Sequence, residues 1–465
     1  MDEAAGIANT YTRRMAEFVA GVGEAEVPAE VLARLKLLIL DSLGCALYAG
    51  DLPWSRILLG VLEGLDATRA CTVWGTGRRL SAPHAALMNG TLVQGFELDD
   101  VHRGGVLHVG AVTLPAVLSV AELRPGMTGR AFLRACLAGY EIGPRVGLCM
   151  GPEHIGQGWH SGATVGVFAA AAGAAAALRL NADQCVHALG MAATQSAGLM
   201  AAQYGAMAKR MHAGRAAQSG LYAALLAEAG FTGIVGPFES EYGGFCTTFS
   251  RSNDRFDREE LVRGLGARFE TMGVALKFYA CVGSNHTTLD ALKAIRRRHP
   301  FRAEEVEKII VSASRVTVDH AGWKYRPEGL TSAQLNLAYC VAVLLLEGDV
   351  FVAQFKEAML ADPDRLALAA RVAVIEDPEI TACGRSFRHM VRVAVLLRDG
   401  TRLEETVEAP RGSEESFASK AEVVEKFRKL AGPRVGEAQM ERIIGCVMEA
   451  ERLPSAAEIA RALAV

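Results

Sequence analysis

The chain lacks the clustered cysteines that metal centres require. Its ten cysteines are scattered over 465 residues, and none of them forms a CxxC pair. Because zinc sites and iron–sulfur clusters need closely spaced cysteines, the sequence predicts neither kind of metal site. A P-loop, an HExxH motif and a GxSxG motif are also missing. Nucleotide-binding, zinc-protease and serine-hydrolase functions therefore have no support.

Long runs of one charge and long apolar runs are missing as well. With 49 basic and 52 acidic residues the formal net charge is −3, and no basic stretch indicates a nucleic-acid partner. The longest apolar run, 162–178, is mostly Ala and Gly, whereas a membrane-spanning helix needs about 20 strongly apolar residues. The first five residues have neither the basic region nor the apolar core of a signal peptide. We expect a cytoplasmic protein without a membrane partner, or an organellar one after processing.

Helical periodicity dominates both ends of the chain. Apolar faces recur at helical spacing up to about residue 268, and frequent Ala and Gly between 162 and 230 favour close helix packing. The helical pattern resumes at Lys420 and continues to the end. The two ends therefore predict one large helical domain.

The stretch between these ends has a different character. Its β-branched residues alternate in part, which predicts strands at 306–318, 371–375 and 390–407. Asp399-Gly400 predicts a hairpin turn within the last of these, and helical patterns cover 284–298 and 333–346. We predict a mostly α protein in which an α+β domain, 269–407, is inserted into a helical domain formed by 1–268 and 408–465.

One short segment, 95–108, holds three carboxylates and two histidines among several glycines. A loop at the end of a helix can present such side chains, here Asp99 and His108 among them, to a pocket. They could form a divalent-metal site or a set of acid, base and hydrogen-bonding groups. The third possibility is a solvated loop with helix-terminal carboxylates.

Two further groups of polar residues stand next to or within apolar helical patterns. His160 precedes the Ala-rich run, where the helix dipole favours a neutral imidazole that can move a proton; the same position also suits a helix cap. Lys209, His212 and Arg215 follow one another at intervals of three. Facing inward they would form a cationic patch for carboxylates, and facing outward a solvated stripe, which the spacing alone favours.

The segment from Lys277 to His286 combines several polar side chains just before a predicted helix. It could hold an anion at the helix N-terminus, or Ser284 and Asn285 could simply cap that helix. Tyr140 and Tyr339 lie within helical patterns, where a single tyrosine most often packs in the core.

Taken in order, these segments resemble the MmgE/PrpD family. The matching segments cover nearly the whole chain: Leu40–Cys45, Asn89-Gly90, Leu98–Asp100 with His108, Gly139–Glu141, Gly158–His160, Lys209–Ala217, Gly230–Gly233, Lys277–His286, Tyr339 and Lys426-Phe427. The resemblance implies a helical domain built from both chain ends, an inserted α+β lid and a homodimer. It also implies an enzyme that needs no metal and no other cofactor.

The family chemistry makes or quenches a carbanion beside a carboxylate of a small polycarboxylate. The resemblance implies His160, Lys209, Tyr140, Lys277 and His108 as catalytic residues, and Asp99, His286, Tyr339 and Arg215 as substrate-binding residues. In this scheme Lys209 and Lys277 pair with substrate carboxylates and stabilise the developing charge. His160 or Tyr140 moves the proton.

The activity we expect is that of a lyase that dehydrates a 2-methylcitrate-like hydroxy-polycarboxylate. The alternatives are an epimerase of an iminodisuccinate-like dicarboxylate, a decarboxylase of a cis-aconitate-like acid, and a catalytically silent dimeric binding protein. The chain departs from the usual run of Asp-x-Asp-Asp-Thr, because it reads Glu97 to Val101, with a longer first acid and no Thr. The spacing to His108 is one residue longer, and Val109 replaces a usual Pro. These departures concern the identity of the substrate.

Overall fold

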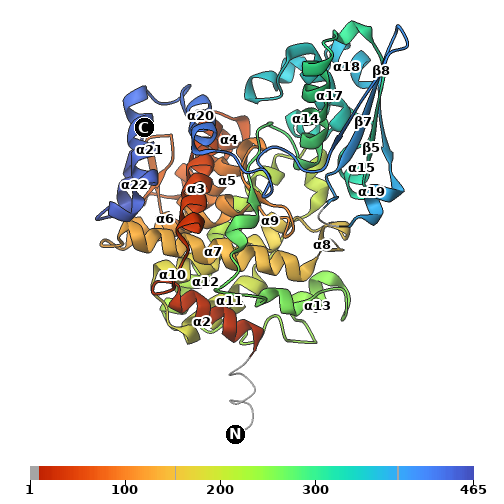
Figure 1. The fold of residues 1–465 in the computed structure, drawn as a ribbon. Coiled ribbons are helices and arrows are strands. Elements are labelled where there is room, and N and C mark those ends of the chain that lie inside the picture. The colour runs from red at the N-terminus through yellow and green to blue at the C-terminus, as the bar shows by residue number, and fades with distance from the viewer. Residues whose placement is uncertain (1–9, 152, 385–386) are drawn as a thin grey trace.

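Two hydrophobic cores organise the protein, one in a helical part and one in an α+β part. The structure is a computed structural model that describes residues 10–151, 153–384 and 387–465. Figure 1 shows the α+β part at the upper right and the helical part to its left and below. This arrangement confirms a mostly α fold with a smaller α+β portion.

The helical part is a bundle in which helices rich in small residues lie deepest. Its main helices are α2 (Tyr11–Gly21), α3 (Ala29–Ala49), α4 (Pro53–Leu65), α5 (Ala82–Val93), α6 (Val109–Leu123), α7 (Gly129–Met150), α10 (Gly166–Ala177), α11 (Ala182–Thr194), α12 (Ala208–Glu228), α20 (Lys420–Ala431), α21 (Glu437–Met448) and α22 (Ala457–Ala462). The Ala-rich α10 packs against α6, α7 and α12, because small side chains let helix backbones approach closely. None of the helices in the described residues is long and apolar enough to cross a membrane.

The two ends of the chain meet where α20 packs along α3, the blue and red helices of Figure 1. Ser419 and Glu422 form a capping box that starts α20. Gly44 on α3 allows a close approach, since a Cβ there would lie 3.1 Å from the ring and 3.3 Å from the Cα of Phe427. The C-terminal helices therefore share a hydrophobic core with the N-terminal helices.

The α+β part contains a four-stranded sheet in the order β6-β5-β7-β8. Its strands are β5 (Val306–Ala313), β6 (Val372–Glu376), β7 (Val391–Leu397) and β8 (Arg402–Val407). β5 and β6 are parallel, and β7 runs antiparallel to both β5 and β8. Helix α14 (Gly283–Arg298) packs on β7 and β8, and α17 (Leu337–Glu347) packs on α14 and β6.

The predicted hairpin at Asp399-Gly400 is confirmed, because β7 and β8 pair across it. The predicted strand 306–318 is wrong in its second half. β5 ends at Ala313, and the Ser314 side chain accepts a hydrogen bond from the Thr317 backbone N–H and so starts helix α15 (Arg315–Ala321). A side-chain cap here overrides the β propensity of the residues that follow.

The predicted helix 333–346 is helical at every residue except Asn336. Two helices, α16 (Leu330–Leu335) and α17, meet at Asn336, whose side chain accepts from the Tyr339 N–H and caps α17. An Asn cap of this kind interrupts a helical pattern that would otherwise continue. The boundaries predicted for the inserted domain remain predictions.

Two segments connect the helical part to the α+β part, and they run side by side. The Leu276 N–H donates to the Gly412 carbonyl at 2.9 Å. Gly412 has a φ of +86°, and a Cβ there would lie 2.4 Å from the Leu276 oxygen and 3.0 Å from the Phe278 ring. Only glycine allows this contact, which places Lys277 at the junction of the two parts.

Candidate active site

The loop after α5 presents the acidic residues of the site. Helix α5 ends at Val93, one 3-10 turn (η1, Gln94–Phe96) follows, and Glu97 adopts a left-handed conformation with φ 60° and ψ 30°. Such a backbone costs a residue with a Cβ roughly 1–2 kcal/mol, so its surroundings must hold it. Glu97 is nevertheless buried, with 2% of its surface exposed.

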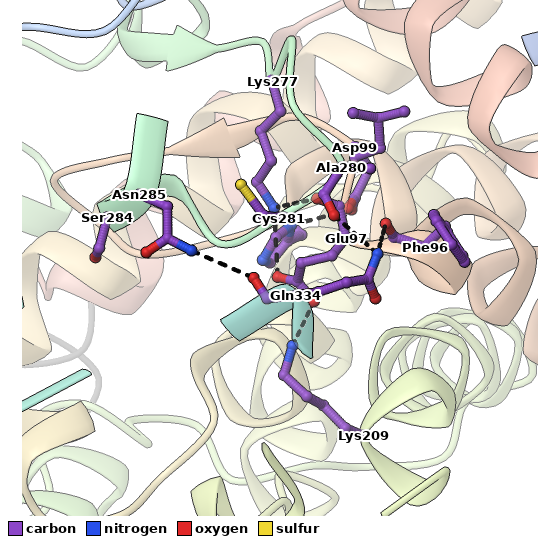
Figure 2. A network of polar contacts seen from close by, with 12 residues as sticks. Phe96, Glu97, Asp99, Lys209, Lys277, Ala280, Cys281, Ser284, Asn285 and Gln334 are labelled. Carbon is purple, nitrogen blue, oxygen red and sulfur yellow. Dashed lines mark hydrogen bonds and ion pairs between the residues drawn. The ribbon is translucent and has the colours of Figure 1, made fainter. Parts of the chain in front are cut away.

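Glu97 is the centre of a buried cluster of one carboxylate and three cations. Its Oε2 lies 2.6 Å from Lys209 Nζ and 2.7 Å from Arg210 Nη1, both at the start of α12. Its Oε1 lies 3.4 Å from Lys277 Nζ, which also donates to the Glu97 carbonyl at 3.2 Å. Figure 2 shows Lys277 and Lys209 approaching Glu97 from opposite sides. We call these four residues the Glu97 cluster.

Burial and neighbouring charge act in opposite directions on the Glu97 carboxylate. Burial raises its pKa, but Lys209, Lys277 and Arg210 outweigh burial and hold the pKa well below its usual range. Burial and the nearby Arg210 lower the pKa of Lys209, while Glu97 opposes them. The carboxylate is therefore ionised, and three cations against one anion leave an excess of positive charge that suits a carboxylate ligand.

Asp99 and His108 form a second pair in the same loop region. Asp99 Oδ2 lies 3.0 Å from His108 Nδ1, with the Asp99 side chain fully buried and that of His108 12% exposed. His108 also contributes to the lowered pKa of Glu97. The loop therefore brings Asp99 and His108 close to the Glu97 cluster, and their roles in catalysis and substrate binding remain predictions.

Asp100 and Tyr140 form a separate buried contact. The Tyr140 hydroxyl donates to Asp100 Oδ2 at 2.7 Å, and the Gly110 N–H donates to Asp100 Oδ1 at 3.0 Å. Burial and Asp99 raise the pKa of Asp100 to about 7, and burial with Asp100 raises the pKa of Tyr140 well above its usual value. Tyr140 is thus a protonated phenol that holds Asp100, an arrangement that does not favour it as a base.

His160 and His212 face each other across the start of α12. His160 immediately precedes the short helix α9 (Ser161–Thr164), and its Nδ1 lies 3.1 Å from His212 Nδ1. Burial, together with nearby Lys209, lowers the pKa of His160 well below its usual value. Burial and Lys209 also lower the pKa of His212 to about 4. Both imidazoles are neutral at pH 7, so one nitrogen of the contact carries a proton and the other accepts it.

The α+β part adds a layer of hydrogen bonds to the cluster. Arg210 Nη2 donates to Gln334 Oε1 at 2.7 Å and to Thr331 Oγ1 at 3.1 Å, both on α16. Gln334 in turn donates to the carbonyls of Phe96 and Ala280, each at 2.9 Å. Figure 2 shows Gln334 close to Glu97, with its amide directed at Phe96. Arg210 and Gln334 thus tie the α+β part to the acidic loop.

Two residues that the resemblance assigned to substrate binding lie inside the α+β part. His286 Nε2 lies 3.2 Å from the Cys281 carbonyl. The Tyr339 hydroxyl accepts from Arg365 at 2.8 Å and donates to the Met359 carbonyl at 3.0 Å. In the described residues, no hydrogen bond or ion pair joins either residue to the Glu97 cluster, so their roles in substrate binding remain predictions.

The basic residues of α12 divide between the interior and the surface. Lys209 is buried, His212 is half-buried, and Arg215 is exposed with its guanidinium on Gln218. These three residues therefore form neither a cationic patch that faces wholly inward nor a stripe that is wholly exposed to solvent. Arg210, which sequence reasoning did not select, is fully buried. The sequence places Arg210 directly beside Lys209. The three-residue spacing of Lys209, His212 and Arg215 does not include it.

The Glu97 cluster is closed to solvent. The side chains of Lys209, Lys277 and Glu97 are 5%, 4% and 3% exposed. A ligand can reach these ammonium groups only when the α+β part moves or the contact with Glu97 opens. Across the described segments, no three His, Cys, Asp or Glu side chains gather in a way that could hold a metal ion.

Comparison with known proteins places the chain in a family. The models of the MmgE/PrpD N-terminal and C-terminal domains match residues 13–257 and 279–450. The chain is 34% identical to the cis-aconitate decarboxylase-like protein oryM of Aspergillus oryzae, with 96% of each chain covered. It is 34% identical to cis-aconitate decarboxylase of Aspergillus terreus over 95% of this chain and 93% of the relative. It is 24% identical to 2-methylcitrate dehydratase of Cupriavidus necator over 89% of each chain.

The chain belongs to the MmgE/PrpD family. Two of the three named relatives are enzymes, a decarboxylase and a dehydratase. The protein is therefore an enzyme of a lyase family.

Proposed function

We propose that the protein is a lyase that acts on a small polycarboxylate by stabilising negative charge that develops beside a carboxylate. The observation that supports this most is the Glu97 cluster, in which three cations surround one carboxylate in a closed, buried site. Fixed donors in a site that excludes water stabilise developing charge far better than water does. Because the side chains supply this positive charge, the proposed reaction needs no metal ion.

Lys209 and Lys277 bind the substrate carboxylates in this proposal. Lys209 and Lys277 reach Glu97 from opposite sides (Figure 2). A substrate carboxylate that replaces Glu97 as the partner of one of these lysines would therefore have that lysine within reach. Arg210 stays on Glu97, because Gln334 and Thr331 fix its other nitrogen. Lys277 lies at the junction of the two parts, so closure of the α+β part brings it onto the substrate.

His160 moves the proton, and His212 completes its hydrogen bonding. A neutral imidazole can take up a proton at pH 7, and a contact to a second imidazole provides a path for that proton. His108, paired with Asp99, lies on the same loop and is the second candidate for the acid or base. Asp99 orients His108 in this scheme.

Decarboxylation is the reaction that the relatives favour, because cis-aconitate decarboxylase of Aspergillus terreus is 34% identical over 95% of this chain. The carbon–carbon bond between a CH₂ group and its carboxylate breaks and CO₂ leaves. The electron pair forms a new C=C bond with the neighbouring carbon, and the pair of the old C=C bond moves to the carbon beside another carboxylate that the lysines hold. A proton supplied by His160 or His108 then adds to that carbon, which leaves a terminal alkene. Dehydration is the second candidate, supported by the more distant 2-methylcitrate dehydratase, and it needs the same stabilised carbanion with hydroxide as the leaving group.

Proton NMR in deuterium oxide tests the proposal. The purified enzyme is incubated with 2-methylcitrate, citrate, cis-aconitate, malate and iminodisuccinate, with and without a metal chelator. We expect a new vinyl signal together with loss of CO₂ from cis-aconitate, unaffected by the chelator. A vinyl signal from 2-methylcitrate alone would select dehydration, and deuterium uptake without an alkene would select epimerisation. Turnover of none of these acids would contradict the proposal.

A homodimer is also part of the proposal. Helix α12 exposes Met211, Tyr222 and Leu226 to 37%, 42% and 39%. These positions follow one another along one stripe of the helix, and Phe231 just beyond it is 60% exposed. An apolar stripe on a central helix suits contact with a second copy. Light scattering during size-exclusion chromatography should give twice the chain mass for wild type and the mass of one chain for Tyr222→Glu. A wild-type protein with the mass of one chain would refute the dimer.

A further inference from the structure

Lys426 is far from the site in sequence, yet it contacts the backbone of the acidic loop. Its ammonium group donates to the Leu98 carbonyl at 2.8 Å and lies 2.6 Å from Asp41 Oδ1. The side chains of Lys426 and Asp41 are 2% and 0% exposed. Lys426 comes from α20, Asp41 from α3 and Leu98 from the loop after α5, so one ammonium group joins three distant segments.

Stability alone does not explain a charged pair at this place. Desolvation offsets most of the attraction in a buried ion pair, and apolar residues of the same volume are often equally stable there. Burial raises the pKa of Asp41 to about 6, even though Lys426 opposes it. Asp41 in turn outweighs burial and raises the pKa of Lys426. The bond to the Leu98 carbonyl is the contact that an apolar pair could not replace.

Two ammonium groups hold consecutive carbonyls of the loop. Lys277 donates to the Glu97 carbonyl at 3.2 Å, and Lys426 donates to the Leu98 carbonyl at 2.8 Å. Glu97 has a left-handed backbone with a φ of 60°, and such a conformation persists only where its surroundings determine it. Together the two lysines fix the peptides between Glu97 and Asp99, the two acids whose side chains face the site.

We propose that Lys426 is a positioning residue for the lyase reaction. It holds the Leu98 carbonyl, and through this carbonyl it sets the directions of the Glu97 and Asp99 side chains. Asp41 keeps Lys426 charged and in place. The effect on turnover rests on the proposed function, whereas the effect on the loop does not. A displacement of about 1 Å at a catalytic group can lower a rate about 10²-fold.

Four variants separate positioning from plain stability. Lys426→Met removes the donor, and Lys426→Arg keeps a cation that can reach the same carbonyl. Asp41→Asn with Lys426→Met removes both charges, so no buried charge remains unpaired. Lys429→Met is the matched control, because Lys429 lies on the same helix but is 60% exposed and pairs with Glu425.

Two measurements are made on each variant. Hydrogen–deuterium exchange reports on the loop, residues 97–101, with α10 as the internal reference. Steady-state kinetics with the substrate identified by NMR reports kcat and KM. We expect faster exchange confined to the loop and a kcat lowered about 10- to 10²-fold in Lys426→Met, with KM changed less than about threefold. Lys426→Arg should restore most of the loss, and Lys429→Met should match wild type.

The double variant decides between the two explanations. We expect it to regain thermal stability while its loop exchange stays fast and its kcat stays low. If the double variant regains kcat as well, Lys426 has only a structural role and the inference is overturned. If Lys426→Met alone does not fold, the double variant still distinguishes positioning from stability. If wild type turns over none of the acids, the proposed function fails, and unchanged loop exchange in the variants would separately overturn the positioning role.

Discussion

Replacing Lys209 by Met should separate catalysis from stability. Lys209 lies 2.6 Å from Glu97 Oε2, but Arg210 at 2.7 Å and Lys277 at 3.4 Å remain on the same carboxylate. Glu97 therefore keeps partners, and the cost of burying the Lys209 charge disappears. Breaking an isolated buried pair costs about 3–5 kcal/mol, so we expect a loss of only about 1 kcal/mol here. Loss of a donor to the developing charge should lower kcat about 10²- to 10³-fold.

Arg210→Met is the matched comparison, since Arg210 binds the same oxygen of Glu97. It also donates to Gln334 and Thr331, and these buried acceptors would be left without their donor. We expect a loss of about 3–5 kcal/mol in the free energy of unfolding. Urea denaturation and kinetics of both variants make the test. The reasoning is refuted if Lys209→Met unfolds as easily as Arg210→Met, or if it keeps wild-type kcat.

Three further predictions concern buried residues of the helical part, beginning with His154, which contacts Thr164 Oγ1 at 2.7 Å. Burial lowers the pKa of His154 to about 4, so its stabilising effect is present above pH 6.5 and lost as pH falls towards 4. Between pH 7.5 and 5, wild type should therefore lose about 2 kcal/mol more than His154→Gln in urea denaturation; equal losses would refute this. The pKa of Asp100, raised to about 7, works in the opposite sense, because its stability is lost as pH rises from 4 to 7. Asp100→Asn should accordingly gain stability relative to wild type over that range, and a constant difference would contradict it. Gly110→Ala should lose about 1–3 kcal/mol, because its Cβ would lie 2.1 Å from Ser42 Oγ and 2.9 Å from the Tyr140 hydroxyl; an unchanged thermal midpoint would show that Ser42 can move aside.

The fold was largely predictable from pattern, because its helices are amphipathic or rich in small residues and its hairpin has a strong turn signal. The misassigned residues lie where one polar side chain decides the backbone. Ser314 ends a strand and starts a helix, and Asn336 divides a helical stretch into two helices. Periodicity averages over a window and does not weigh a single cap.

The candidate site was predictable only in part. The resemblance supplied Lys209, Lys277, Asp99, His108 and His160, which the structure places on or beside the Glu97 cluster. The contacts that depend on three-dimensional proximity could not be read from the chain. Glu97 gains its partners from positions 112 to 180 residues away. Lys426 meets Leu98 across 328 residues.

The most direct test of the central claim, that the lysines of the Glu97 cluster act on a substrate carboxylate, is release of labelled carbon dioxide. Wild type and Lys209→Met are incubated with uniformly ¹³C-labelled cis-aconitate, and the ¹³CO₂ released is followed over time by mass spectrometry. We expect steady release by wild type, and release lowered about 10²- to 10³-fold by the folded variant. Equal release by both enzymes would contradict the role of Lys209, and no release by wild type would contradict decarboxylation itself.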